Sequence, residues 1–456
     1  MFGIRESGSS VHREVIGGLT TFMAMSYILF VQPEVLALAG MDRGGVFMAT
    51  CLSSAAACFL MGLLANYPVA LAPGMGENFF FVFTLCGVAG GSFKLSWQEA
   101  LALTAVVGVV FLALSLVEFR SKILAAIPAS LKTGITAGIG LFITLIGLQY
   151  ANVVVASPAT SVTLAPMPGN YVAGLALLGL AVTGALVAYR VPGAILLGIL
   201  FTTAAAWAAG QIWHVPAVAW RYPVGTPHGL EATAGGLLAG FAGLWDKLLS
   251  KDSLNVVILG FVLLFMAVFD TVGTLVGVGQ RAGLMRDGRL LRAERALAAD
   301  AAGTVVGAAL GTSTVTCYIE SAAGVTAGAR TGLATIVTGL CLVAALFFQP
   351  LVGMVGAGIP VGKGLAYPTI APALILVGAM MMRSLRDIPW DDVTEALPAF
   401  LTMVMMPFGY SIAAGIAIGF ISYAALKLLT ARPRQCPLAV YILAALFILQ
   451  YLVMPH

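Results

Sequence analysis

Five acidic residues fall inside long apolar stretches of this sequence: Glu34, Glu77, Asp270, Asp300 and Glu320. An ionised carboxylate within a membrane costs on the order of a few kcal/mol, so its default interpretation is functional. Burial also disfavours the charged form of a carboxyl group, which allows it to bind and release protons near neutral pH. For Glu34 and Asp300 a structural role, at a helix end or in a pair, is equally compatible with the sequence.

The other three acids stand beside polar groups or helix interruptions. Asp270 lies in the second half of the apolar stretch FVLLFMAVFDTVGTLVGVG. Glu320 comes where the run STVTCYI should turn into the helix ESAAGVTAG, and Glu77 and Asn78 follow GMG in LAPGMGENFFF. A carboxylate can accept two ring N–H groups, whereas an amide both donates and accepts. This inventory fits a flat heterocycle with N–H and C=O edges, and it also admits an amino acid or an inorganic ion.

Other residue types argue against enzymatic chemistry. No GxxxxGK[ST] phosphate loop occurs, so ATP hydrolysis by this chain is not expected. The histidines and cysteines show no metal-ligand spacing and no nucleophile–base pair is visible, so we predict no enzyme activity, metal or cofactor. A scattered net charge of +4 gives no reason to expect a nucleic acid partner. One ring of Phe79–Phe80–Phe81 could stack on an aromatic ligand, whereas at least two are expected to pack.

The composition places these residues in a membrane. Of the 456 residues, 60% are hydrophobic and 9% are charged, and the mean hydropathy is +1.01. Such a chain has too few polar groups to cover a water-exposed surface. Apolar runs recur at lengths that cross about 30 Å of hydrocarbon. We therefore expect an all-α polytopic protein of the cytoplasmic (inner) membrane.

The apolar runs form two series of seven. The first spans are expected at 15–38, 46–66, 69–86, 99–118, 131–150, 171–189 and 193–210. Residues 211–253 connect the series and include a short amphipathic piece at Leu244–Leu249. The second spans are expected at 254–279, 295–310, 312–328, 331–349, 365–382, 395–407 and 410–428. The repeats thus cover 13–210 and 254–430, and the C-terminal segment 431–456 holds one further apolar stretch, 438–454, either an interfacial helix or a fifteenth span.

The positive charges indicate the orientation. If the N-terminus is cytoplasmic, most of the 23 Lys and Arg residues, with Arg120 and Lys122 among them, lie in cytoplasmic loops. The other side then holds Arg43, Lys94, Arg221, Lys247, Lys251 and Lys363. This is the positive-inside bias, and it favours a cytoplasmic N-terminus.

An odd number of spans in each half gives two repeats of opposite orientation, an arrangement common in secondary transporters. TFMAMSYILFV in the first span is similar to LFMAVFDTVGTLV in the eighth. The third and tenth segments are both irregular, because Pro73, Gly74 and Gly76 disfavour a helix in one and the β-branched run Thr312–Thr316 in the other. Short extended segments are therefore expected in both. Paired interrupted segments indicate a binding site near the midplane, shielded from lipid by protein.

Four motifs together resemble the azaguanine-type purine permeases, the adenine/guanine/hypoxanthine branch of the second nucleobase–cation symporter family. They are GGLTTFMAMSYILFVQPEVL, LAPGMGENFFF, FDTVGTLVGVGQRAGL and GTSTVTCYIESAAGVTAGARTGL, and the resemblance runs from about residue 13 to 430. It implies a core domain from spans 1–4 and 8–11 and a gate domain from spans 5–7 and 12–14. It also implies proton symport of a purine nucleobase by an elevator-like movement of core against gate, often in a homodimer.

The resemblance assigns roles to individual residues. Asp270 matches the span-8 acid, Glu320 the span-10 acid and Asn78 the third-segment asparagine, and all three are expected at the base. Thr274, one helical turn past Asp270, matches a polar position near the base or in coupling. The predicted binding set is completed by Glu77, Phe79 and Ser321. Asp270, Glu320 and Glu77 are also predicted to take part in proton coupling.

Two positions depart from the family pattern. Gln32 precedes Pro33 where the family usually has VNP, and Glu77 replaces a hydrophobic residue before Asn78. A third acid beside the pocket would alter specificity or coupling. The closest alternative keeps the fold and carries another heterocycle, such as xanthine, uric acid or uracil. An anion transporter of the same architecture is more distant, because clustered acids disfavour an anionic cargo.

Overall fold

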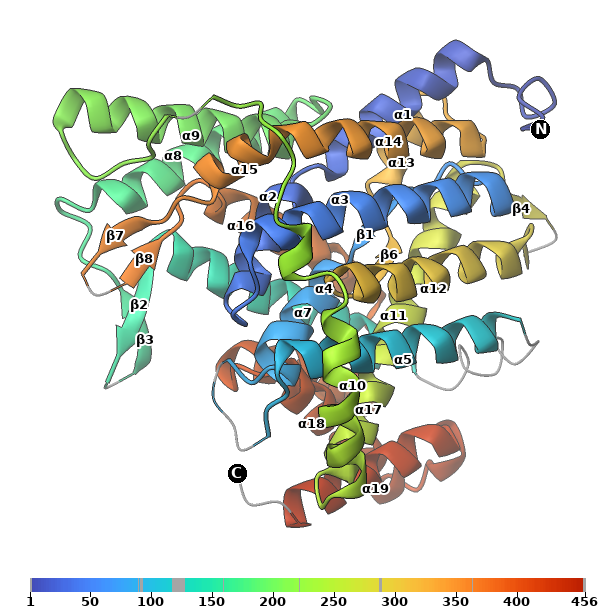
Figure 1. Cartoon of the computed structure of the whole chain (residues 1–456). Helices are drawn as coiled ribbons and strands as arrows, with labels where there is room; N and C mark the ends of the chain where they lie inside the picture. Colours follow the sequence, from blue (N-terminus) through green and yellow to red (C-terminus); the bar gives the residue numbers. More distant parts are fainter. Residues whose placement is uncertain are drawn as a thin grey trace.

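The computed structural model describes residues 2–88, 90, 93–116, 128–158, 160–220, 222–286, 289–362 and 364–453. These residues form a bundle of helices with four two-stranded sheets (Figure 1). In this part of the chain nine helices are long and apolar enough to cross a membrane. Outside the described residues lie the loop charges Arg120, Lys122, Arg221 and Lys363, together with residues 117–118 and 454 of two expected spans.

The first repeat begins with α1 (Val11–Met25), α2 (Ile28–Ala37) and α3 (Arg43–Leu60), which continues as the π-helix η1 (Met61–Ala65). Its third segment consists of β1 (Leu71–Pro73), α4 (Met75–Phe79) and the π-helix η2 (Phe80–Leu85). The remaining elements are α5 (Trp97–Ser115), α7 (Ala129–Tyr150), β2 (Val154–Ser157), β3 (Ser161–Leu164), α8 (Tyr171–Ala188) and α9 (Ala194–Trp213).

The connection contains the 3₁₀-helix η3 (Leu230–Ala232) and α10 (Gly236–Leu249). The second repeat starts with α11 (Ser253–Arg281), β4 (Met285–Arg286), β5 (Arg289–Leu290), α12 (Ala293–Leu310), β6 (Val315–Cys317) and α13 (Ser321–Thr326). It continues with α14 (Gly332–Ala345), η4 (Leu346–Phe348), α15 (Gln349–Val355), β7 (Ile359–Val361), β8 (Gly364–Ala366), α16 (Ala371–Met381), η5 (Met382–Asp387), α17 (Val393–Phe408) and α18 (Ile412–Leu429). Beyond the repeat lie the short 3₁₀-helix η6 (Pro433–Gln435) and α19 (Leu438–Val453).

Helical or extended structure occurs at every expected span, with three differences in detail. The first span is divided after Met25, where the Ser26 hydroxyl bonds to the Met23 carbonyl, a side-chain bond that competes with the helix ladder. The amphipathic piece expected at Leu244–Leu249 is longer, because α10 begins at Gly236. The hairpins β2–β3, β4–β5 and β7–β8 were not predicted, since they are too short to show a strand periodicity.

The C-terminal stretch packs along the bundle. α19 contacts α18, and the Phe420 and Phe447 rings lie 6.3 Å apart. Near its end, the Gln450 amide donates to Asn255 Oδ1 at the start of α11 (2.7 Å). α19 therefore runs from beside the end of α18 to the level where α11 begins, the path of a helix that lies alongside the spans.

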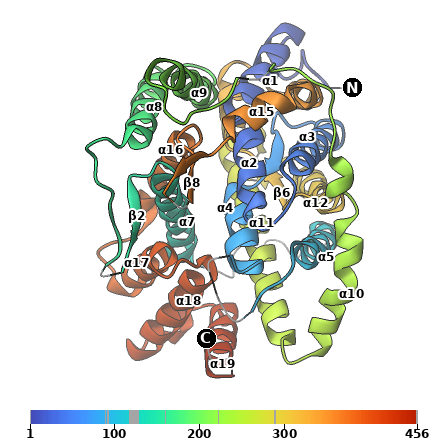
Figure 2. The same cartoon turned by 60° about the vertical axis from the view of Figure 1, so that its left-hand side comes forward.

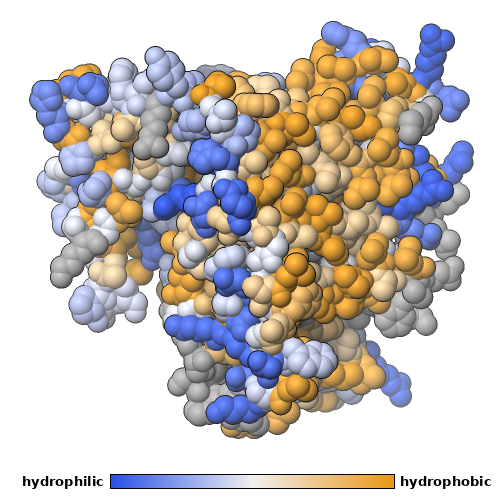
Figure 3. All heavy atoms as spheres, viewed as in Figure 1, coloured by the Kyte–Doolittle hydropathy of each residue, from blue (hydrophilic) through white to orange (hydrophobic). Residues whose placement is uncertain are grey.

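The helices pack in two sets. One consists of α1, α3, α5, α11, α12 and α14, and the other of α7, α8, α9, α16, α17 and α18. Figure 2 shows most of the first set on the right and the second on the left. Figure 3 shows hydrophobic side chains over the face formed by α14, α3 and α12, as a lipid-facing surface requires.

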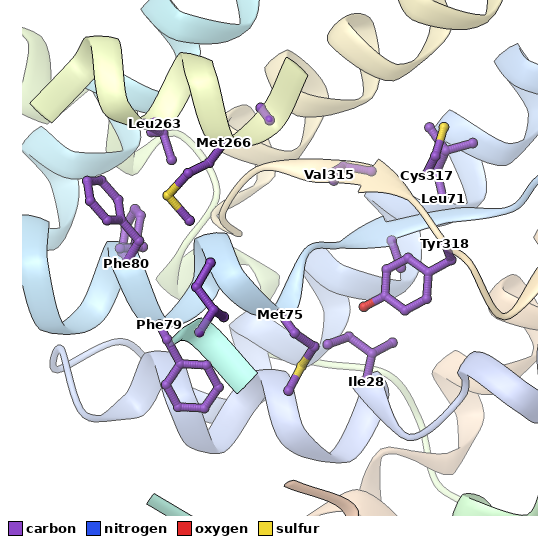
Figure 4. Close-up of a cluster of buried hydrophobic side chains, with 14 of the residues drawn as sticks. Ile28, Leu71, Met75, Phe79, Phe80, Leu263, Met266, Val315, Cys317 and Tyr318 are labelled. Atoms are coloured by element: carbon purple, nitrogen blue, oxygen red, sulfur yellow. The ribbon is translucent and has the colours of Figure 1, made fainter. Parts of the chain in front are cut away.

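β1 and β6 pair in the interior of the bundle (Figure 4). They are antiparallel, with the register Leu71↔Cys317, Ala72↔Thr316 and Pro73↔Val315. The Gly74 N–H donates to the Thr314 carbonyl (3.0 Å), and the Tyr318 N–H donates to the Ala70 carbonyl (2.9 Å). Backbone groups at membrane depth have no water to bond to, so pairing with each other makes two interrupted spans possible.

Gly74 connects β1 to α4 and has no room for a side chain. A Cβ at this position would lie 2.2 Å from Glu77 Oε2 and 2.6 Å from Thr316 Cγ2. Its backbone is extended (φ −70°), so close approach alone explains the glycine.

We expect Gly74→Ala to lower stability by about 1–3 kcal/mol, the usual cost of forcing an extra methyl group into a packed interior. Thermal unfolding of the purified protein in detergent measures the change. Gly353→Ala in α15 is the matched control, because a Cβ there meets nothing within 4 Å and alanine favours the helix. Equal melting temperatures for the two variants would contradict the packing argument.

A charged cluster is buried among α7, α17 and α18. Lys427, whose side chain is 1% exposed, places Nζ 2.7 Å from Glu395 Oε1 and 2.8 Å from Thr394 Oγ1. The Tyr423 hydroxyl donates to Glu395 Oε1 (2.7 Å), and the Ser130 hydroxyl donates to Oε2. The carboxylate of Glu395 thus joins the start of α7 to α17 and α18.

We expect Lys427→Met to destabilise the protein by about 3–5 kcal/mol, because it leaves the Glu395 carboxylate without its cation. The control is Arg432→Met, which removes an exposed pair with Asp392 (3.3 Å) and should change the melting temperature little. A small effect of Lys427→Met would mean that the hydroxyl groups alone satisfy Glu395.

Candidate functional site

Acids from three elements surround the β1–β6 pair. Glu77 lies in the first turn of α4, Glu320 is the residue directly before α13, and Asp270 projects from α11. The side chain of Asp270 keeps accessible surface, unlike those of Glu77 and Asp300. Its charge interacts with those of Glu320 and Glu77. The structure therefore brings together the three acids that the sequence singled out.

Tyr27 fixes the orientation of Glu320. Its hydroxyl donates to Glu320 Oε1 (2.9 Å), and its ring lies 6.5 Å from the ring of Tyr318. The Tyr318 hydroxyl donates to the carbonyl of Pro73 at the end of β1 (2.5 Å). Tyr27 stands at the division between α1 and α2, where a side chain from the first span can reach the tenth segment.

Sequence reasoning did not select Tyr27, although a signal existed. When TFMAMSYILFV is aligned with LFMAVFDTVGTLV from their shared FMA, Tyr27 falls opposite Asp270. The two repeats thus place a polar side chain at equivalent positions, one an acid and the other a phenol. Only the structure shows that the phenol serves the acid of the tenth segment.

Asn78 and Gln32 meet the tenth segment from two sides. Asn78 is buried, and its Oδ1 accepts a bond from the Ser313 hydroxyl. Within the described residues its Nδ2 has no hydrogen-bond partner. The Gln32 amide donates to Thr312 Oγ1 and Ser313 Oγ, both at 3.0 Å. Gln32, which departs from the family pattern, therefore connects the first span to the tenth segment.

The remaining predicted binding residues have varied surroundings. Thr274 is buried on α11. The Ser321 hydroxyl accepts the Ala70 N–H (3.0 Å) and so helps to hold the strand pair. Phe79 is fully buried and stacks on Phe83 at 6.0 Å, and Figure 4 shows it apart from Phe80, which lies nearer to Leu263 and Met266. Phe79 and Ser321 thus have structural partners, and their contact with a ligand stays a prediction.

The last two intramembrane acids differ from each other. Asp300 is buried, and its Oδ2 accepts the Thr271 hydroxyl (2.7 Å), which in turn lies 2.9 Å from the Thr316 hydroxyl of β6. Asp300 is therefore bonded to Thr271, the residue that directly follows Asp270 in the chain. Glu34 pairs with Arg43 (2.9 Å), as its structural interpretation requires.

The arrangement can accept N–H donors and hold protons. Its polar groups are carboxylates, hydroxyls and the two amides of Asn78 and Gln32, which together provide hydrogen-bond donors and acceptors. Across the described residues no group of three or more His, Cys, Asp or Glu side chains could hold a metal ion.

Comparison with known proteins agrees with this architecture. A model described as the Permease family matches residues 12–418. The guanine/hypoxanthine permease PbuG of Bacillus subtilis is 44% identical over 463 residues, covering 99% of this chain and 98% of the relative. The adenine permease AdeP of Escherichia coli is 42% identical, covering 99% and 95%.

A solved structure shows the same fold. The transmembrane domain of a cyanobacterial bicarbonate transporter, BicA, matches with a TM-score of 0.62 at 13% identity, covering 90% of this chain and 97% of that one. The fold is that of two inverted seven-span repeats with interrupted third and tenth segments. This multi-pass membrane protein therefore belongs to the Permease family, and within it to the azaguanine-type purine permeases that its motifs resemble.

Proposed function

We propose that this permease carries adenine, guanine or hypoxanthine across the cytoplasmic membrane by proton symport. The observation that supports this best is the meeting of Asp270, Glu320 and Glu77 beside the two interrupted segments. Relatives named as guanine/hypoxanthine and adenine permeases support the substrate class.

The polar groups suit the edges of a purine. Asp270 and Glu320 accept ring N–H groups, and the bond from Tyr27 occupies one oxygen of Glu320 while leaving lone pairs on the carboxylate. The Asn78 Nδ2 supplies a donor for a ring nitrogen or a carbonyl oxygen. A base that satisfies both kinds of group is preferred over an apolar ring of the same size, because unpaired buried polar groups are costly.

Proton coupling follows from the crowding of the acids. Carboxylates whose charges interact repel one another when both are ionised, and binding a proton relieves that repulsion. Carrying uncompensated charge through the membrane is expensive, whereas a site neutralised by protons and occupied by a base crosses more easily. Asp270, Glu320 and Glu77 are the groups assigned to this exchange, with Asp300 connected to them through Thr271.

The two sets of helices correspond to the two domains that an elevator-like movement requires. We assign spans 1–4 and 8–11 to a core domain and spans 5–7 and 12–14 to a gate domain, and the observed packing of the helices supports this division. Phe83 and Phe142 meet across it with ring centroids 5.4 Å apart. An elevator-like displacement of core against gate would carry the site across the membrane, with the N-terminus in the cytoplasm and the chain in a homodimer.

An anion is the second candidate cargo, because the fold is shared with a bicarbonate transporter. Glu77 and Glu320 argue against it, since they place negative charge at the start of both helical segments beside the strand pair, where an anion would be repelled. Xanthine and uric acid differ from adenine, guanine and hypoxanthine in the groups on their ring edges, and uracil also has one ring instead of two. Competition by unlabelled bases against labelled hypoxanthine distinguishes these heterocycles.

We expect Glu320→Gln to weaken binding of hypoxanthine roughly 10–100-fold, because hydrogen bonds to a charged partner contribute about 1.5–3 kcal/mol. Tyr27→Phe, which removes only the hydroxyl, should weaken binding less but in the same direction. Equilibrium binding of labelled base to purified protein measures both. Tyr441→Phe, outside the site, is the control, and normal binding by Glu320→Gln would refute the assignment.

We expect Asp300→Asn to separate binding from coupling. The amide keeps the shape of the side chain but cannot carry a proton, so uptake into proteoliposomes driven by a pH gradient should fall at least about tenfold. Binding of the base to the same variant should persist. Asp391→Asn, on the exposed surface, is the matched control. Unchanged gradient-driven accumulation would exclude Asp300 from the proton route.

A further inference from the structure

α10 presents an apolar stripe that the rest of the described chain does not cover. The stripe consists of Leu238, Phe241, Trp245 and Leu249, which are 71%, 39%, 62% and 72% exposed. Their spacing places them on one side of the helix. A neighbouring side of the helix, with Leu237, Gly240 and Leu244, is buried against the protein.

The helix is pressed against the beginning of α5. A Cβ at Gly240 would lie 2.0 Å from the Gln98 carbonyl oxygen, and one at Gly236 would lie 2.4 Å from the Trp97 ring. Lys247 Nζ lies 2.7 Å from Glu99 Oε2. These contacts fix α10 relative to α5 and leave the stripe facing outward.

α10 and the residues before it lie at the ends of several spans. The Gly235 N–H donates to the Ala309 carbonyl (3.0 Å) and the Thr233 hydroxyl to the Leu310 carbonyl (3.1 Å), both at the end of α12. α5 begins beside Gly236, and α11 begins at Ser253, directly after α10. Since helix ends mark the membrane surface, α10 lies at that level.

The direction of α10 agrees with this position. In Figures 1 and 2 it runs across the direction of α5 and α12 rather than along it. With its 14 residues α10 is about 21 Å long, too short to span the hydrocarbon even if it were turned.

We propose that α10 is an interfacial helix whose apolar stripe is inserted at the boundary between headgroups and acyl chains of the leaflet where α5 and α11 begin. Amphipathic helices with aromatic and aliphatic residues on one face bind at this depth, and Trp is enriched there. Asp246 lies beside the stripe on the exposed surface, where it faces the headgroups and water. With a cytoplasmic N-terminus, this leaflet is the outer one.

A lipid surface fits the stripe better than a second copy of the chain. Stable protein interfaces bury about 800 Å² on each partner, more than four partly exposed side chains supply. This inference depends on the fold alone and not on the proposed cargo or its coupling, so failure of either leaves the other standing.

Spin labels test the proposal. Single cysteines are introduced as Leu238→Cys, Phe241→Cys, Trp245→Cys and Leu249→Cys, with Asp246→Cys as the matched control on the same helix. The background carries Cys341→Ala, because the other five native cysteines are buried. The labelled full-length protein is reconstituted in phosphatidylcholine–phosphatidylglycerol nanodiscs, and relaxation by oxygen is compared with relaxation by a water-soluble nickel chelate.

The four stripe positions should be relaxed more by oxygen, which concentrates in hydrocarbon, and position 246 more by the chelate. Greater relaxation by the chelate at all five positions would place α10 in water and overturn the proposal. Protection of the stripe from both reagents would show that a second copy covers it, which also overturns the proposal. Four independent stripe positions keep the test decisive if one variant fails to fold.

Discussion

The pairing of β1 with β6 is the constraint on which the rest of the site depends. Two spans are interrupted inside the membrane, and each interruption exposes backbone groups that lipid cannot satisfy. The strands satisfy each other, from Ala70 and Tyr318 at one end to Gly74 and Thr314 at the other. Because the two segments come from different repeats, the pair also sets the relative position of the acids that follow them.

Several buried acids of the described chain differ in the partners that they have. Glu395 with Lys427 and Glu34 with Arg43 have a cation within 3 Å, and they join elements together. Two of the acids near the strand pair accept hydroxyl groups instead, since Tyr27 donates to Glu320 and Thr271 donates to Asp300. A hydroxyl orients a carboxylate without neutralising it, so protons and a hydrogen-bonding ligand remain the means of doing so. This contrast distinguishes the acids that join structural elements from the acids that we propose to serve binding and coupling.

Much of the site was predictable from local patterns. Asp270, Glu320 and Glu77 were evident because a charge in an apolar run is rare, and the interrupted third and tenth segments because Pro73, Gly74 and the β-branched run at 312–316 break helices. The two-repeat fold followed from the count and lengths of the apolar runs. Tyr27 and Gln32 were not selected, because a phenol or an amide in a span carries no comparable signal until its partner is known.

The sequence by itself determined that this is a membrane protein with two series of apolar runs and acids within them, because hydropathy, periodicity and rare charges are local properties. Only the tertiary structure decided which of those acids share a site. Residues 320 and 270, or 300 and 271, approach one another through the pairing of strands and helices far apart in the chain. The same holds for α10, whose composition indicates an amphipathic helix, whereas its place across the ends of α5 and α12 is a consequence of packing.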